Sequence, residues 1–143
     1  MKGIVVDASI AAAWLLSDEK SKTAEWVLDQ MQAGVTVSVP TLWLLEITNV
    51  LFNAERRKRI DRQHRDSALE RIERLPLTIL AAPSLADLKT LRLYADKHQL
   101  TAYDAEYLRV SKEQKLMLAT LDGNLLAAAK RENVHLAATS RGA

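Results

Sequence analysis

The chain has 143 residues, of which 48% are hydrophobic and 27% are charged, so it has enough apolar material for the core of one compact domain. Its 20 Lys and Arg residues against 18 Asp and Glu residues leave a formal net charge of +2, which favours no class of partner. The absence of cysteine excludes disulfides and thiolate metal sites and is compatible with a reducing cytoplasm, where we expect the protein to act.

In the first half of the chain, short runs rich in Val and Ile alternate with stretches of helical periodicity. The first run ends at Asp7, and Gly34 and Pro40 are typical of a helix end and a helix start. Asp7 also interrupts the apolar N-terminus, and no second apolar span follows, so we expect no signal peptide and no contact with a membrane. The predicted elements are a strand over residues 3–6, helices over 8–16 and 17–33, a strand over 35–39 and a helix over 41–57.

The second half repeats this alternation, with Asp61, Ser84 and Asp122 in positions typical of helix starts. The predicted elements are a helix over residues 61–75, a strand over 77–81, helices over 84–95 and 102–113, a strand over 116–120, a helix over 122–133 and a strand over 134–136. Such alternation predicts an α/β fold with a parallel sheet covered on both faces. We expect one domain over residues 1–138, and a mobile tail over 139–143, which has no apolar anchor.

Two aspartates stand where parallel strands end. Asp7 ends the first predicted strand, and Asp122 lies just past the fourth. In α/β sheets, ligands bind beyond the carboxyl ends of the strands, so the two carboxylates would meet at one edge if these strands are neighbours. Each aspartate could instead merely cap the helix that follows it.

Two further acids lie within apolar segments. Glu46 belongs to residues 42–51, which predict a helix that is buried all round, and no Lys or Arg lies within one turn of it. The carboxyl group of Glu46 must therefore be protonated, bound to a cation or paired with a distant arginine. Asp104 is expected to face inward in the same way, or to be an ordinary helix-start carboxylate, whereas Glu106 falls on another face and is expected to be solvated.

Four carboxylates in one pocket would repel each other, and a divalent cation removes this conflict. Ligation by oxygen alone suits Mg²⁺ or Mn²⁺ rather than zinc. Such sites usually bind phosphates, activate a water molecule and stabilise the leaving oxygen. The acids therefore indicate phosphodiester or phosphoryl chemistry.

Four segments in order, residues 5–9, 45–51, 100–105 and 119–125, give the chain its resemblance to the PIN-domain ribonucleases, in particular the VapC-type toxins of prokaryotic toxin–antitoxin pairs. The resemblance implies a PIN-like three-layer α/β/α sandwich, with a central, mainly parallel sheet of four to five strands flanked by helices. It also implies Mg²⁺- or Mn²⁺-dependent cleavage of RNA, a cognate antitoxin that inhibits it, and a homodimer. By this resemblance the catalytic residues and metal ligands are Asp7, Glu46, Asp104 and Asp122.

Polar residues beside these acids are expected to support them. The resemblance implies that Ser9 and Thr120 orient carboxylates or bridging water molecules. Asn49 lies three residues after Glu46 and shares its helix face. Relatives often carry another acid at the position of Asn124, which leaves the number of tightly held metal ions open.

The densest basic stretch of the chain is Arg56, Arg57, Lys58 and Arg59. Its functional interpretation is contact with the phosphates of RNA. The alternatives are a solvated loop between helices, or a patch that an acidic segment of the antitoxin covers.

Aromatic and histidine residues are expected to be mainly structural. Trp14, Trp26, Trp43 and Phe52 lie on the early helices and are predicted core residues, the alternative being a partly exposed apolar groove for an antitoxin segment. His64, His98 and His135 share no ligand spacing, which argues against a zinc site.

Two other classes of function remain open. A metal-dependent phosphotransfer domain also places an aspartate at the end of its first strand, but the dehalogenase type needs a second aspartate where this chain has Ser9. A dinucleotide-binding domain would need a glycine-rich turn after the first strand, which is missing here. The second class that remains open is a catalytically silent PIN-like scaffold that binds RNA or protein. The presence of all four acids argues against such a scaffold.

Overall fold

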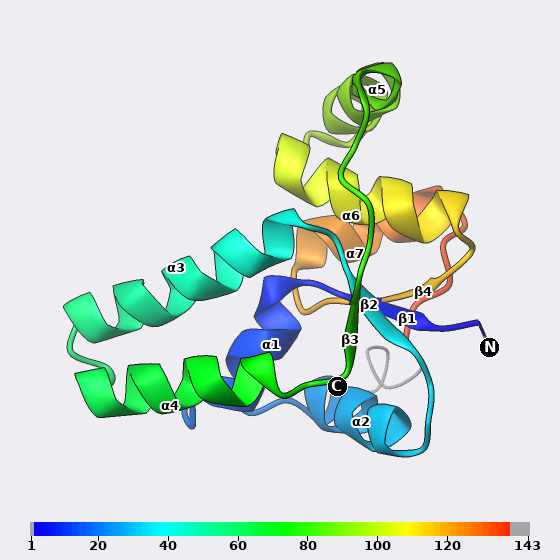
Figure 1. Cartoon of the computed structure of the whole chain (residues 1–143). Helices are drawn as coiled ribbons and strands as arrows, with labels where there is room; N and C mark the ends of the chain where they lie inside the picture. The colour runs from blue at the N-terminus through cyan, green and yellow to red at the C-terminus, as the bar shows by residue number, and fades with distance from the viewer. Residues whose placement is uncertain (1, 138–143) are drawn as a thin grey trace.

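A computed structural model describes residues 2–137 of the chain (Figure 1). The strands are β1 (Ile4–Val6), β2 (Val37–Val39), β3 (Leu77–Ile79) and β4 (Met117–Ala119). The helices are α1 (Ala8–Leu15), α2 (Lys22–Gln32), α3 (Leu42–Arg56), α4 (Arg62–Glu73), α5 (Leu88–His98), α6 (Ala102–Glu113) and α7 (Gly123–Arg131), with a 3₁₀ turn, η1 (Leu85–Asp87), before α5.

The four strands form one parallel sheet in the order β3-β2-β1-β4. The chain therefore starts in the middle of the sheet, adds β2 and β3 on one side of β1, and later adds β4 on the other side. The predicted strand over residues 134–136 is reduced to a single bridge between Leu118 and Leu136. Because β1 and β4 are neighbours, the segments that follow them meet at the same edge, where the strand order reverses.

Helices cover both faces of this sheet. In Figure 1, α1 and α2 lie below it, α6 and α7 lie above it, and α5 packs outside α6. This arrangement confirms the predicted α/β/α sandwich. Helices α3 and α4 pack on each other as a hairpin that projects from the sandwich beside α1.

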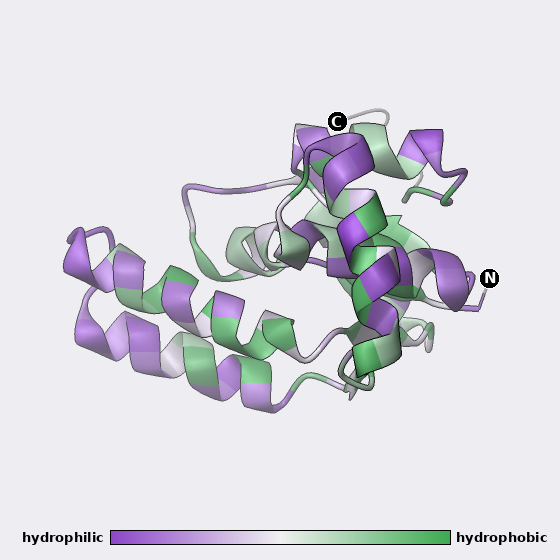
Figure 2. Ribbon diagram, turned by 90° about the horizontal axis from the view of Figure 1, so that it is seen from above, coloured by the Kyte–Doolittle hydropathy of each residue, from purple (hydrophilic) through white to green (hydrophobic). Residues whose placement is uncertain are grey.

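The core is centred on β1, whose residues Ile4, Val5 and Val6 are completely buried. Burial of one such side chain contributes about 1.5–3 kcal/mol relative to its exposure. Figure 2 shows hydrophobic colouring in the sheet, whereas hydrophilic and hydrophobic turns alternate along the projecting hairpin. The hairpin thus contributes one buried face to the core, with Trp43, Ile47, Leu51, Ala54 and Ala68, and leaves much of its other surface to solvent.

The prediction that helix α3 is buried all round is wrong. Its buried residues Trp43, Ile47 and Leu51 recur every four residues and form one stripe, whereas Leu44 and Leu45 are 44% and 74% exposed. The helix is amphipathic because only one face packs on the body of the protein.

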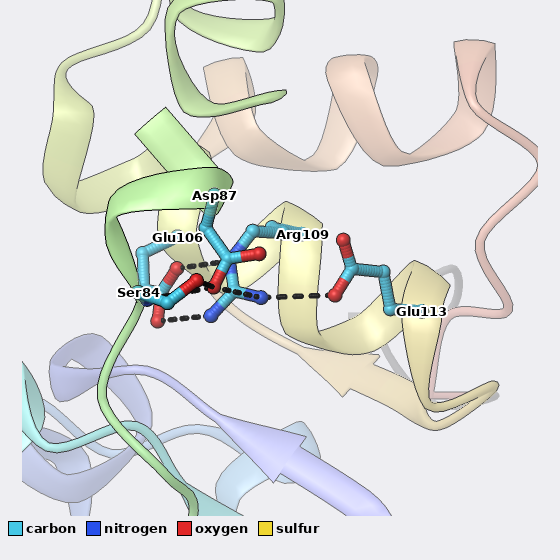
Figure 3. A network of polar contacts seen from close by, with 5 residues as sticks. All are labelled: Ser84, Asp87, Glu106, Arg109 and Glu113. Atoms are coloured by element: carbon cyan, nitrogen blue, oxygen red, sulfur yellow. Dashed lines mark hydrogen bonds and ion pairs between the residues drawn. The ribbon is translucent and has the colours of Figure 1, made fainter. Parts of the chain in front are cut away.

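The prediction that Glu106 is solvated is also wrong, since this residue is only 2% exposed. Figure 3 shows its carboxylate beside the guanidinium of Arg109. Both of its carboxylate oxygens accept hydrogen bonds from Arg109, at 2.6 and 2.9 Å, and this guanidinium also pairs with Glu113 and Asp87. Arg109 follows Glu106 by one helical turn, so the pair forms within α6 and its link to Asp87 holds η1 against that helix.

The structure bears on the remaining expectations to different degrees. Trp43 is fully buried and Trp14, Trp26 and Phe52 are partly buried. His98 pairs with Glu132, and no helix of the described residues combines the length and hydropathy needed to cross a membrane. The predicted tail over residues 139–143 lies outside the described part of the chain.

Candidate functional site

Asp7 both caps a helix and lies at the carboxyl edge of the sheet. Its Oδ1 accepts hydrogen bonds from the backbone N–H groups of Ser9 and Ile10 and, at 2.5 Å, from the Ser9 hydroxyl. Its Oδ2 accepts a hydrogen bond from the hydroxyl of Thr120, which follows β4. Because the side chain is only 6% exposed, these donors hold it in one orientation.

Ser9 and Thr120 join the ends of two neighbouring strands. The Ser9 Oγ accepts from the backbone N–H of Leu121 at 2.9 Å, and the Thr120 Oγ1 accepts from that of Asp122 at 3.1 Å. Each hydroxyl therefore donates to Asp7 and accepts from the segment after β4. The two residues fix Asp7 relative to Asp122, which itself caps α7 through the N–H groups of its residues 124 and 125.

Glu46, on α3, has a partner that sequence reasoning missed. Its Oε1 accepts a hydrogen bond from the hydroxyl of Tyr107 at 2.5 Å, and Tyr107 is 1% exposed. The partner is thus a neutral donor on α6 rather than a distant arginine. The signal that could have found it is the spacing of Tyr107, which stands one helical turn after Asp104 on the same helix.

The four acids share one region of negative potential. Burial raises the pKa of Asp7, and the hydrogen bonds that its carboxylate accepts offset this increase only in part. Burial also raises the pKa of Glu46, with further increases from the charges of Asp7 and Asp104. The pKa of Asp104 is raised by burial and then by the charges of Asp122 and Asp7. Side chains that follow β1, lie on α3 and α6, and precede α7 are therefore close together in the fold.

Burial raises the pKa of Tyr107 far above its ordinary value, and its contact with Glu46 and the charges of Asp7 and Asp104 add to this effect. The hydroxyl therefore stays protonated at neutral pH and remains a hydrogen-bond donor to the carboxylate. The site thus has a fixed donor on the side of Glu46 that faces the protein interior.

This donor set fits a hard divalent cation. Within residues 2–137, no Lys, Arg or His forms an ion pair with any of the four acids. In the same part of the chain, no three acid or histidine side chains are already arranged to enclose a metal ion. Mg²⁺ typically keeps several water molecules and contacts only one or two carboxylates, so an open site with all-oxygen donors suits it.

Within residues 2–137, no hydrogen bond links the side chains of Asn49, Asn124 or the basic stretch to the four acids. The side chains of Asn49 and Asn124 are exposed, and Asn124 contributes its backbone N–H to Asp122. The basic stretch lies at the far end of α3 and is divided among different contacts. The Arg59 guanidinium pairs with Asp18 and Glu19, and the Arg56 guanidinium lies over the Phe52 ring, 5.7 Å from its centre.

Comparisons with known proteins relate the chain to one family. A family model described as the PIN domain matches residues 4–133. Ribonuclease VapC3 of Pyrobaculum aerophilum is 32% identical over 123 residues, which are 85% of this chain and 91% of that protein. Ribonuclease VapC9 of Mycobacterium tuberculosis is 31% identical over 119 residues, which are 83% of this chain and 85% of that protein.

Solved structures show the same fold. The crystal structure of PAE2754 from Pyrobaculum aerophilum matches with a TM-score of 0.64 at 25% identity, over 88% of this chain and 84% of that one. The crystal structure of VapBC2 from Rickettsia felis, bound to a DNA fragment from the VapBC2 promoter, matches with a TM-score of 0.61 at 13% identity. The match covers 93% of this chain and 96% of that one. The second match concerns the fold alone.

Proposed function

The chain belongs to the PIN-domain family and to its VapC-type ribonucleases, and on this premise we propose that it is the toxin of a toxin–antitoxin pair that hydrolyses RNA with Mg²⁺ or Mn²⁺. The observation that carries the proposal is the group of four acids at the carboxyl edge of the sheet, drawn from four elements and without a cationic partner in the described chain. A divalent cation from solution would balance this charge.

We assign the following roles to the side chains. Asp7 and Asp122, at adjacent strand ends, would hold the cation together with Asp104 and Glu46, directly or through water. The bound ion would bind phosphate oxygens and lower the pKa of an attacking water molecule. Ser9 and Thr120 keep the Asp7 carboxylate in place, and an acid that does not ligate the ion directly can accept the proton of that water.

We further propose that a cognate antitoxin covers this site, that the toxin acts as a homodimer in the cytoplasm, and that residues 1–138 form its single domain. The curated relatives are named VapC ribonucleases, which supports RNA as the substrate. The exposed Leu44 and Leu45 lie next to Glu46 and provide apolar surface beside the acids for a protein partner.

The proposal is tested by incubating the purified protein with RNA in EDTA, Mg²⁺ or Mn²⁺, beside the variant Asp7→Asn. We expect cleavage only with a divalent cation, and a loss in the variant larger than the roughly 10- to 100-fold that changes around a metal site cause. Cleavage in EDTA, or equal cleavage by the variant, would refute the proposal. The match to the PIN family disfavours a phosphotransfer domain, and a silent scaffold would bind RNA in this assay without cleaving it.

A further inference from the structure

A groove of about 300 Å³ lies between α1 and α3. One end is formed by Ala8 and Ser9, and the hydroxyl of Ser9 donates to Asp7. The other end is formed by Asn53, Arg57 and Arg59. A strand of RNA whose reacting phosphate lies at the acids can therefore continue into this groove.

One stripe of α3 connects the two ends. Glu46, Val50, Asn53 and Arg57 follow one another at intervals of four, three and four residues, which places them on the same helix face. At about 1.5 Å per residue, Arg57 lies roughly 16 Å along the helix axis from Glu46. This distance corresponds to a few nucleotides of an extended strand.

The charge of this groove comes from a single residue. Glu19 and Arg59 both line the groove but neutralise each other, with a distance of 2.7 Å between their charged atoms. Arg56 lies over Phe52 and is not among the lining residues. Arg57 lines the groove and forms no ion pair with any residue in the described range 2–137. Its guanidinium is therefore free to bind an anion.

We propose that this groove is a subsite for a backbone phosphate of RNA, bound by the guanidinium of Arg57 and the side-chain amide of Asn53. This inference rests on the proposed function, and it assigns a distinct role to one arginine of the basic stretch. A guanidinium suits this role because it can donate two parallel hydrogen bonds to a phosphate. An acidic protein segment fits less well, because the end of the groove at Ser9 is next to the carboxylate of Asp7, which would repel it.

The test measures binding of a fluorescent single-stranded RNA oligonucleotide to protein that carries Asp7→Asn, so that the RNA stays intact. In this background we expect Arg57→Gln to weaken binding about tenfold. The slope of log K against log salt should also flatten by about 0.7, the value for one phosphate contact of a single strand. Arg56→Gln is the matched control, with the same chemical change one position away, and should leave both quantities almost unchanged.

Two more measurements make the assignment specific. Arg57→Lys keeps the charge, so its affinity for RNA should lie between those of the parent protein and of Arg57→Gln. Circular dichroism must show that all variants are folded. In the otherwise unchanged protein, Arg57→Gln should raise the KM for RNA cleavage and leave kcat unaltered.

Equal losses for Arg56→Gln and Arg57→Gln would overturn the subsite, because they would indicate unspecific attraction by the whole basic stretch. So would a fall in the affinity for a polyglutamate peptide without a change in the affinity for RNA, which would make Arg57 part of a protein-binding surface. The binding measurements do not depend on catalysis. Failure of the parent protein to cleave RNA would therefore refute the proposed function while Arg57-dependent binding still supported the subsite.

Discussion

The hydroxyl of Tyr107 on α6 donates a hydrogen bond to Oε1 of Glu46 on α3, over 2.5 Å. The two residues are 61 positions apart in the chain and belong to two different helices. Tyr107 is buried and Glu46 is only half-buried, and the contact fixes one oxygen of the carboxylate and leaves the other without a hydrogen bond from the described residues. Tyr107 is therefore a positioning residue for Glu46.

Replacing Tyr107 by Phe removes this hydrogen bond and keeps the buried ring. We expect RNA cleavage and Mn²⁺ affinity each to fall by about 10-fold, the lower end for residues that orient a metal ligand. The free energy of unfolding should fall by only about 1 kcal/mol. Cleavage rates, Mn²⁺ titrations and urea unfolding measure these effects. Tyr103→Phe, at an exposed position of the same helix, is the control, and unchanged metal affinity in Tyr107→Phe would contradict the positioning role.

Asp7→Asn should stabilise the protein in the absence of divalent cations. Since burial raises the pKa of Asp7 above 3.8, its ionisation costs stability as the pH rises past that value. An asparagine keeps the oxygen that caps α1 and removes the charge, but its amide nitrogen cannot accept the hydrogen bond of Thr120, so we expect a net gain of at most about 1 kcal/mol at pH 7. Urea unfolding in EDTA at pH 7 and pH 3 measures this gain, which should shrink at the lower pH. Asp29→Asn, on the exposed face of α2, is the control, and a loss of stability in Asp7→Asn at pH 7 would disprove the expectation.

Glu132 should determine part of the acid stability of the fold. Burial raises its pKa, but hydrogen bonds from Lys97, Lys112 and His98 outweigh burial and lower the pKa from 4.5 to about 2. Because the folded pKa is the lower one, the carboxylate stabilises the fold above about pH 4.5, and this contribution is lost as the pH falls toward 2.

We therefore expect Glu132→Gln to lower the free energy of unfolding at pH 7 by about 2 kcal/mol, since a tenfold change in proton affinity corresponds to about 1.4 kcal/mol. The difference from the wild type should disappear near pH 2. Unfolding curves between pH 2 and pH 7 test this dependence, with the exposed Glu73→Gln as control. A deficit that stays constant over this range would show that the loss comes from packing rather than from charge.

The buried pair of Glu106 and Arg109 should respond more strongly to one substitution than to two. Arg109→Met leaves the carboxylate of Glu106 buried without a partner, which typically costs about 3–5 kcal/mol. The double variant Glu106→Leu with Arg109→Met removes both charges, while Asp87 and Glu113 are exposed enough to be solvated. We expect it to recover at least half of the loss in urea unfolding, and a double variant less stable than the single one would rule out this account.

Much of the fold was predictable because hydrophobic periodicity is a local property. The alternation of strands and helices, the parallel sheet and the position of Asp7 at a strand end all follow from neighbouring residues in the sequence. Element boundaries were less accurate: α2 begins at Lys22 rather than near residue 17, because Ser21 caps it through the N–H of Ala24. The exposed face of α3 was missed, since a run of apolar residues does not reveal which of them has a neighbour to pack on.

By itself, the sequence determined which residue types stand at the strand ends and in the helices, and hence the four acids and the sandwich that carries them. Only the tertiary structure decided which distant side chains meet: Thr120 with Asp7, Tyr107 with Glu46, and Glu19 with Arg59. These contacts depend on strand order and helix packing, which bring together residues dozens of positions apart, and no local pattern records that distance. The same packing separates Arg57 from its basic neighbours, although all of them look alike in the sequence.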